Sequence, residues 1–173
     1  MSSQGPRSGG TFDGGSAGNV WTNPGNVVAS DNVYADCSLG ATPSSSAALT
    51  VTNFGFTIPA GATIRGIKVE REGKCDINGA VIGIACQLIK GGAVHGTDKG
   101  GGPALGDTDG YATIGGATDL WGGTWTPADI NASNFGFYEA VYNTIGAGLS
   151  AHMDHVRITV YYSEPLSGQI LIF

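Results

Sequence analysis

The side chains that could do acid–base or metal chemistry are few and lie in short groups. His152, Asp154 and His155 are close in sequence, and imidazole and carboxylate groups of this kind serve as catalytic acids, bases and zinc ligands. Their spacing, at the start of an expected strand, matches neither a catalytic triad nor a zinc site. His95 stands apart from them. We therefore expect His152 and His155 to be an inert pair at the surface.

Acidic residues form two further groups, and neither completes a known motif. The string DTDG at 107–110 resembles the opening of a calcium loop, but the remaining EF-hand positions, including the terminal glutamate, are absent. Glu70 and Glu72 alternate with an arginine and share one strand face, without the aromatic cleft that a glycosidase needs. No phosphate loop and no Gly-x-Ser-x-Gly motif is present. The sequence predicts no enzyme, no metal and no cofactor; calcium at Asp107 and Asp109 is the open alternative.

The cysteines are an odd number, Cys37, Cys75 and Cys86, and lack the C-x-x-C spacing of metal sites. Cys86 shares its expected strand face with Ile84, where a small buried apolar residue belongs. A two-residue turn after Cys75 would place that residue opposite Ile82, not opposite Cys86. Free buried thiols are therefore favoured over a disulfide.

Aromatic residues offer the clearest alternative to a purely structural role. Trp21, Trp121, Trp125 and Tyr111 could form a stacking surface for a sugar, since aromatic rings present flat apolar faces. Trp121 and Trp125 also bracket two glycines and precede a short helical turn over 127–131, capped by the threonine at 126. This arrangement favours tryptophans that anchor a corner onto the edge of a β-core.

The elements that must position these residues are strands. The chain has 173 residues, 30 of them glycine and only 13% charged, which is typical of short strands joined by tight turns in one domain. We expect an all-β fold: a two-sheet antiparallel β-sandwich, jelly-roll-like, with an extended N-terminal arm and an apolar C-terminal tail. The expected strands cover 20–21, 27–39, 44–56, 62–74, 81–90, 111–114, 135–143 and 154–163.

Two features inside the sandwich domain are predicted from local pattern. In the strand over 62–74, Ile64 is out of phase with Ile67 and Val69, so a β-bulge is expected at Gly66. The stretch 91–110 is rich in glycine and longer than most connections, so we expect an exposed loop that projects or forms a contact surface.

The two ends of the chain are expected to lie outside the sandwich domain of residues 19–163. Residues 1–18 form a Gly- and Ser-rich arm with one aromatic residue, Phe12, which cannot order itself without an outside contact. Residues 164–173 form a tail that ends in consecutive apolar side chains, an aggregation liability unless covered. The tail either adds a strand to its own sheet or binds a neighbouring subunit, and the second is favoured. The expected assembly contacts are Phe12, Ile170, Leu171, Ile172 and Phe173.

Charge and hydropathy exclude several partners. The formal charge of −6 argues against nucleic acid, which needs clustered lysine and arginine. No run of apolar residues is long enough to predict a membrane span, and the first ten residues lack the apolar region of a signal peptide. The sequence thus predicts a protein made in the cytoplasm that leaves it by lysis or within a particle.

Three strings resemble one family. FGFTIPAGATIRGIKVE at 54–70, DLWGGTWTPADINASNFGF at 119–137 and DHVRITVYY at 154–162 are similar to a β-rich domain of tailed-bacteriophage and prophage virion structural proteins of the decoration, tail or fibre type. This resemblance spans about 20–162 and brings no catalytic motif. It implies a capsid decoration or cement protein in the virion, bound to the major capsid or another virion protein and homo-oligomeric, with a trimer expected by analogy.

Two alternatives to a decoration protein stay open. A glycan-binding module of a tail fibre or adhesin would use the tryptophans and Tyr111 to bind a surface glycan. A subunit of an extracellular filament would use both termini for strand exchange. Tryptophan exposure separates the first alternative from the others, because a sugar platform must be open to solvent.

Overall fold

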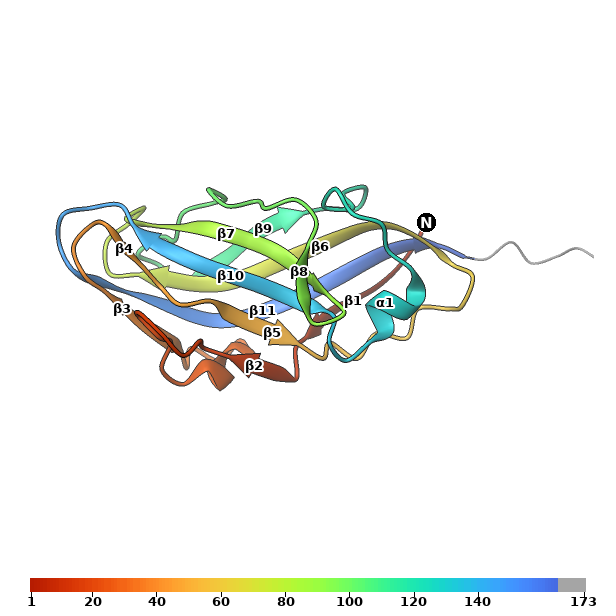
Figure 1. Ribbon diagram of the computed structural model, residues 1–173, viewed down its shortest axis with the longest axis horizontal. Coiled ribbons are helices and arrows are strands. Elements are labelled where there is room, and N and C mark those ends of the chain that lie inside the picture. The colour runs from red at the N-terminus through yellow and green to blue at the C-terminus, as the bar shows by residue number, and fades with distance from the viewer. Residues whose placement is uncertain (165–173) are drawn as a thin grey trace, which may run out of the picture.

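The chain folds into two antiparallel β-sheets packed face to face, as seen in a computed structural model that describes residues 1–164 (Figure 1). Sheet A has the order β1-β11-β6-β9, with β3 pairing along another part of β11, and sheet B has the order β2-β5-β10-β7-β8, with β4 pairing with β10. From β5 to β11 the chain alternates between the sheets, except for the hairpin of β7 and β8. The expected jelly-roll-like sandwich is therefore confirmed.

The two longest strands, β6 and β11, both lie in sheet A. β6 and β11 form the centre of sheet A, and β10 forms the centre of sheet B between β5 and β7. The bounds in sheet A are β1 Ser2–Ser8, β3 Ala35–Leu39, β6 Thr63–Cys75, β9 Gly110–Gly115 and β11 Leu149–Ser163. The bounds in sheet B are β2 Thr11–Asp13, β4 Ser44–Ser45, β5 Leu49–Thr52, β7 Val81–Lys90, β8 Ala93–His95 and β10 Gly136–Asn143. The helical turns are η1 Pro24–Val27 and α1 Pro127–Asn131.

The N-terminal segment belongs to the sandwich, and its expected role as a separate arm is wrong. β1 pairs with the end of β11, where Ser2 lies opposite Tyr162, and β2 pairs with β5, where Phe12 lies opposite Val51. Strand pairing supplies the backbone hydrogen bonds that composition alone could not predict. Phe12 is 43% exposed, and its use as an assembly contact stays a prediction. The expected contacts Ile170, Leu171, Ile172 and Phe173 lie outside the described residues.

The strand bounds agree best with the sequence where alternation is strong. β6, β7, β9 and β10 begin and end within one residue of the expected positions. The bulge expected at Gly66 is confirmed one residue away: Tyr161 pairs with Gly66 and Tyr162 with Ile64, which leaves Arg65 unpaired. β11, in contrast, begins at Leu149, earlier than the expected start at residue 154. Of the expected strand over 27–39 only β3 forms, and residues 20–21 lie between isolated bridges at Asn19 and Thr22.

A second bulge changes the face assigned to Cys86. Ala140 pairs with Ala85 and Val141 with Gly83, so Ile84 is the unpaired residue of β7. The bulge turns Ile84 outward, with 41% exposure, while Cys86 points into the core. The face shared by these residues was wrongly predicted, but the burial of Cys86 was correct. Cys37, Cys75 and Cys86 are all buried free thiols.

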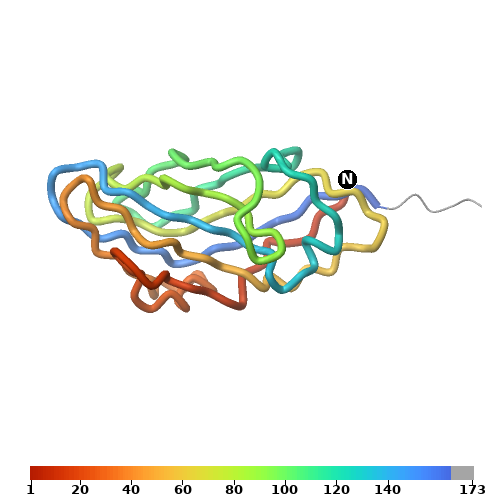
Figure 2. The backbone as a smooth tube through the Cα atoms, viewed as in Figure 1, coloured from red at the N-terminus to blue at the C-terminus, as the bar shows by residue number. Residues whose placement is uncertain are grey.

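The long segment 91–110 does not project from the domain. After β8 it returns along β7, where the amide of Lys99 donates to the carbonyl of Cys86 (2.8 Å) and that of Leu105 to the carbonyl of Val81 (2.8 Å). Figure 2 shows this stretch following β7 before the chain turns into β9. The segment covers the edge of sheet B that the short β8 leaves open, which explains its length.

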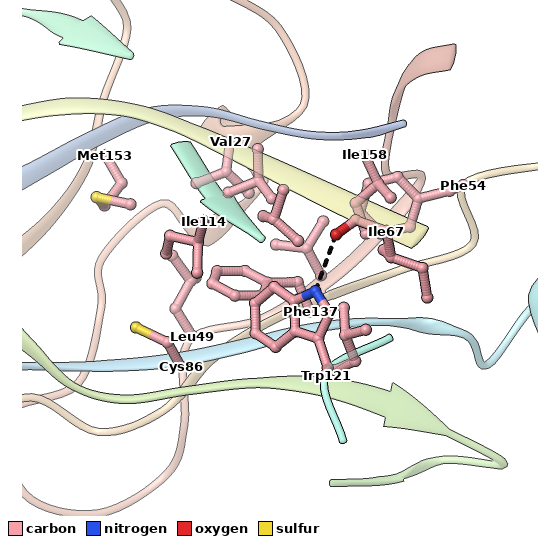
Figure 3. Close-up of a cluster of buried hydrophobic side chains, with 14 of the residues drawn as sticks. Val27, Leu49, Phe54, Ile67, Cys86, Ile114, Trp121, Phe137, Met153 and Ile158 are labelled. Carbon is pink, nitrogen blue, oxygen red and sulfur yellow. Dashed lines mark hydrogen bonds between the residues drawn. The ribbon is translucent and has the colours of Figure 1, made fainter. Parts of the chain in front are cut away.

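The corner between β9 and α1 is held by tryptophan. The Trp121 ring is fully buried beside Phe137, and its Nε1 donates to the carbonyl of Ile67 at 2.9 Å (Figure 3). Trp121 itself has a positive φ of 55°, followed by Gly122 at 65°. The predicted helical turn is confirmed as α1, in which the side chains of Thr126 and Asp129 form a capping box. No helix within residues 1–164 is long and apolar enough to cross a membrane.

The largely apolar core between the sheets contains a buried ion pair. Arg71 of β6 and Glu139 of β10 are 0% and 1% exposed, and Arg71 Nε lies 3.1 Å from Glu139 Oε1. The Arg71 guanidinium also donates to the carbonyl of Pro103. Burial raises the pKa of Glu139, and the positive charge of Arg71 acts in the opposite direction. The pair therefore links the two sheets at their interior faces.

Candidate functional site

The outer face of sheet A carries a ladder of polar cross-strand rows over β11, β6 and β9. One row consists of His155, Glu72 and Tyr111, which lie directly opposite one another on the three strands. The next row consists of Arg157, Glu70 and Thr113. Side chains in such a row lie within contact distance. The expectation that Glu70 and Glu72 share one face is confirmed by the alternating burial along β6.

A bulge in β11 places two consecutive residues beside this ladder. Met153 pairs with Gly73 and His155 with Glu72, so Asp154 is left without a pairing partner on β6. Met153 points into the core, and Asp154 approaches Glu72 on the outer face. Asp154 is nevertheless only 1% exposed. In a regular strand consecutive side chains point to opposite faces, so either Asp154 or His155 would have pointed into the core.

His155 is a buried member of a hydrogen-bonded chain and not the inert surface residue that we expected. Its Nε2 lies 2.7 Å from Ser8 Oγ, and its Nδ1 lies 2.7 Å from the Tyr111 hydroxyl. Burial lowers the pKa of His155, and the negative charge of Glu72 acts against this shift. A serine nucleophile also needs a carboxylate behind its histidine, whereas here a phenol holds that place. These hydrogen bonds therefore connect β1 and β9 to β11.

His152 has a separate, electrostatic role at the far end of sheet A. Its Nδ1 lies 2.6 Å from Asp36 and its Nε2 lies 3.0 Å from Asp76. Burial alone would lower the pKa of His152, but hydrogen bonds to both aspartates outweigh it and raise the pKa. The interaction joins β3 to the turn after β6. His95, the remaining histidine, packs edge-on against Trp125 at a centroid distance of 5.2 Å.

Tyr111 is the aromatic residue that this polar face presents to solvent. It is 36% exposed, and the Arg157 guanidinium carbon lies 3.8 Å from its ring centroid. Arg157 also bonds both carboxylate oxygens of Glu70, at 3.2 and 3.3 Å. Burial alone would raise the pKa of Glu70, but its hydrogen bonds to Arg157 and Lys68 lower it, so the carboxylate is charged at neutral pH.

A groove of about 390 Å³ adjoins the ring of Tyr111. Its floor comes from β9 and the end of β6, and its wall from the segment that leads into β9. This volume lies in the range of pockets that accept small ligands. Its lining residues are Gly73, Pro103, Ala104, Leu105, Gly106, Thr108, Gly110, Tyr111, Ala112 and Thr113.

The tryptophans do not contribute to this or any other exposed face. Trp21, Trp121 and Trp125 are 4%, 0% and 8% exposed. Each indole N–H donates to a backbone carbonyl, at 3.1 Å for Trp21, 2.9 Å for Trp121 and 2.9 Å for Trp125. The predicted stacking surface therefore loses its tryptophans to the core, which is the anchoring role that the sequence favoured, and keeps only Tyr111.

Carboxylates that could hold a metal also meet at this face. Glu72, Asp109 and Asp154 each place one oxygen within 4.8 Å of the others. Asp107, expected beside Asp109 in a calcium loop, is exposed and not part of the group. The string DTDG thus identified one of the three residues. The sequence analysis named Asp154 only beside the two histidines, and no local pattern joins it to Asp109, because its position depends on the bulge in β11.

Comparison with known proteins adds little to this description. No family model and no curated protein matches the chain. Among solved structures, a CBM4 domain is similar with a TM-score of 0.44 and 12% identity over 85% of this chain and 91% of that one. The N-terminal cellulose-binding domain of β-1,4-glucanase C from Cellulomonas fimi has a TM-score of 0.37 and 10% identity over 91% and 89%. Values this low indicate neither family membership nor a ligand for this chain.

Proposed function

We propose that the protein is a non-catalytic glycan-binding module that uses the outer face of sheet A around Tyr111. The observation that carries the proposal is an exposed aromatic ring set in a ladder of charged side chains next to a groove. Sugars present both an apolar ring face and a rim of hydroxyl groups. A site for them therefore combines an aromatic surface with hydrogen-bonding groups in fixed positions.

The groups beside Tyr111 are held in place by their own interactions. Arg157 and Glu70 form a paired donor and acceptor, and Lys68 Nζ lies 3.0 Å from Glu70 Oε2. Thr113 adds a hydroxyl in the same row. Paired charges that need no rearrangement lower the entropic penalty of binding. Of these side chains, Thr113 lines the groove together with Tyr111. A glycan that extends from the groove across the sheet would also contact Arg157 and Glu70 at its hydroxyl groups and the Tyr111 ring at its apolar face.

The virion setting remains part of the proposal, in the form of a tail-fibre or adhesin module. The capsid decoration hypothesis relied on two terminal segments that would bind neighbouring subunits. The first of these segments forms β1 and β2 and pairs within the chain's own sheets. That leaves the decoration hypothesis with less support than glycan binding, for which Tyr111 is exposed.

The test is oligosaccharide and polysaccharide binding by the purified full-length chain, screened on a glycan array and measured by calorimetry. We expect saturable binding that falls about five- to thirtyfold in Tyr111→Ala, since one stacked ring contributes roughly 1–2 kcal/mol. Tyr138→Ala is the matched control, because Tyr138 is half-buried on sheet B. Equal binding by both variants, or an array without any signal from the folded protein, would contradict the proposal.

A further inference from the structure

The acidic group on the outer face of sheet A draws its members from three distant parts of the sequence. Glu72 lies on β6, Asp154 lies at the bulge of β11, and Asp109 lies in the segment just before β9. Asp31 supports the group from another loop, since its backbone amide points at Asp154 Oδ1 at a distance of 3.4 Å. The carboxylates are therefore positioned by paired strands and a loop that contacts them.

Each of the three carboxylates has a buried oxygen that lacks a partner. Glu72 Oε2, Asp109 Oδ1 and Asp154 Oδ2 make no hydrogen bond within the described residues. Asp154 gives the strongest evidence for a missing partner, because only 1% of its surface is exposed. Buried carboxylate oxygens are almost always hydrogen-bonded or bound to a cation. Three carboxylates that meet within 4.8 Å, each with an unpartnered buried oxygen, indicate a missing positive group.

The neighbouring basic side chains do not supply that group. The Lys74 ammonium lies over the ring of Tyr34, 4.8 Å from its centroid, and forms no ion pair with the three carboxylates in the described chain. Both ring nitrogens of His155 are bonded to hydroxyl groups. Arg157 is occupied by Glu70. None of these basic side chains therefore forms an ion pair with the three carboxylates within the described residues.

The three carboxylates also crowd one another, because one oxygen of each lies within 4.8 Å of the others. Proximity of this kind is unfavourable without a counter-ion, and a bound cation would remove the penalty.

We propose that Glu72, Asp109 and Asp154 form a binding site for a divalent cation, with calcium as the expected ion. The three ligands are all carboxylates, and oxygen donors of this type select hard cations such as calcium, magnesium and manganese. Calcium is favoured among them because it tolerates irregular geometry, which suits ligands from two strands and a loop. The site closes the ends of β6, β9 and β11 against one another and is independent of whether a glycan binds beside it.

The test begins with full-length protein stripped of metal by a chelator and titrated with calcium by calorimetry. We expect one calcium ion per chain with a dissociation constant between about 1 µM and 1 mM, together with a rise in melting temperature. Asp154→Asn and Glu72→Gln keep the side-chain shape and should each weaken calcium binding at least about tenfold. Asp107→Asn is the matched control, since Asp107 lies in the same loop but outside the group, and should bind as the wild type does.

A second readout keeps the test independent of folding defects. Without metal, Asp109→Asn should melt at or above the temperature of the wild type, because it removes one of the repelling charges. With calcium bound, the wild type should melt at a higher temperature than Asp109→Asn. The proposal is overturned if the wild type binds no calcium at about 10 mM, if Asp154→Asn binds as tightly as the wild type, or if only zinc binds.

Discussion

Arg71 and Glu139 face each other across the interior of the sandwich, where most contacts are between apolar side chains. Both are fully buried, Cys86 Sγ lies 3.5 Å from Glu139 Oε1, and Arg71 Nη1 and Glu139 Oε2 have no hydrogen-bond partner in the described chain. Taking two charges out of water carries a large desolvation penalty, which their attraction offsets only in part. We therefore expect the loss of one of the two charges to destabilise the protein more than the loss of both.

Breaking the pair from one side should strongly destabilise the protein. We expect Arg71→Met or Glu139→Leu alone to lower the free energy of unfolding by about 3–5 kcal/mol, because the remaining charge stays buried without a counter-ion. The double variant should recover most of this loss. Urea unfolding followed by circular dichroism measures all three. If the double variant loses as much as the two single losses combined, the charges are not coupled and the expectation is wrong.

At the scale of single elements, β1 contributes more to the stability of the sandwich than its polar composition suggests. The strand is polar, contains Pro6, and lies at the edge of sheet A, where Gln4 pairs with Val160 and Arg7 with Ile158 across a bulge. Ser8 at its end bonds His155. Its stability therefore comes from backbone pairing with a long, well-formed neighbour and not from the burial of its own side chains.

Deleting residues 1–8 should destabilise the sandwich. The deletion exposes the edge of β11 over the residues that pair with β1. At roughly 1 kcal/mol for each lost backbone hydrogen bond, we expect a loss of about 2–4 kcal/mol in urea unfolding. Ser3→Ala is the control, since Ser3 is exposed and the variant keeps the backbone pairing. A truncated chain as stable as the full one would show that β1 does not belong to the cooperative unit.

At the scale of the whole molecule, the buried thiols report on whether both sheets unfold together. Cys37 and Cys75 lie in sheet A and Cys86 lies in sheet B, and all three are 2% exposed or less. Burial raises the pKa of Cys37 to about 11 and also raises the pKa of Cys86. Thiol reagents react with the thiolate form of cysteine. The folded protein therefore protects these residues in two ways: it blocks access of the reagent and it keeps the thiols protonated.

The native chain should react with a thiol reagent only by global unfolding. We expect the three cysteines to be labelled at one common rate, and that rate should rise with urea as the unfolding rate does. Mass spectrometry after brief labelling separates this case from local opening, since intermediates with one or two labels should be rare. Fast labelling of any single cysteine would show that its strand opens independently of the rest.

Local pattern in the sequence was enough to determine the elements with strong alternation and clear caps. The strands β6, β7 and β10, the helical turn α1 and the bulge beside Gly66 follow from side-chain period, capping residues and phase shifts within a few neighbours. The shared face of Glu70 and Glu72 follows in the same way. These features depend on residues close together in the chain, which is why the sequence predicts them.

Contacts between distant segments decided the rest. β1 is a strand because β11 offers it an edge more than 150 residues later, as the pairing of Ser2 with Tyr162 shows. The tryptophans are buried because the corner folds onto β6, and Tyr111 alone of the proposed stacking residues stays exposed. The carboxylate group forms because a bulge in β11 turns Asp154 outward beside Glu72. A sequence read by local period carries no information on which strands pair or in which register, and only the tertiary structure settles that choice.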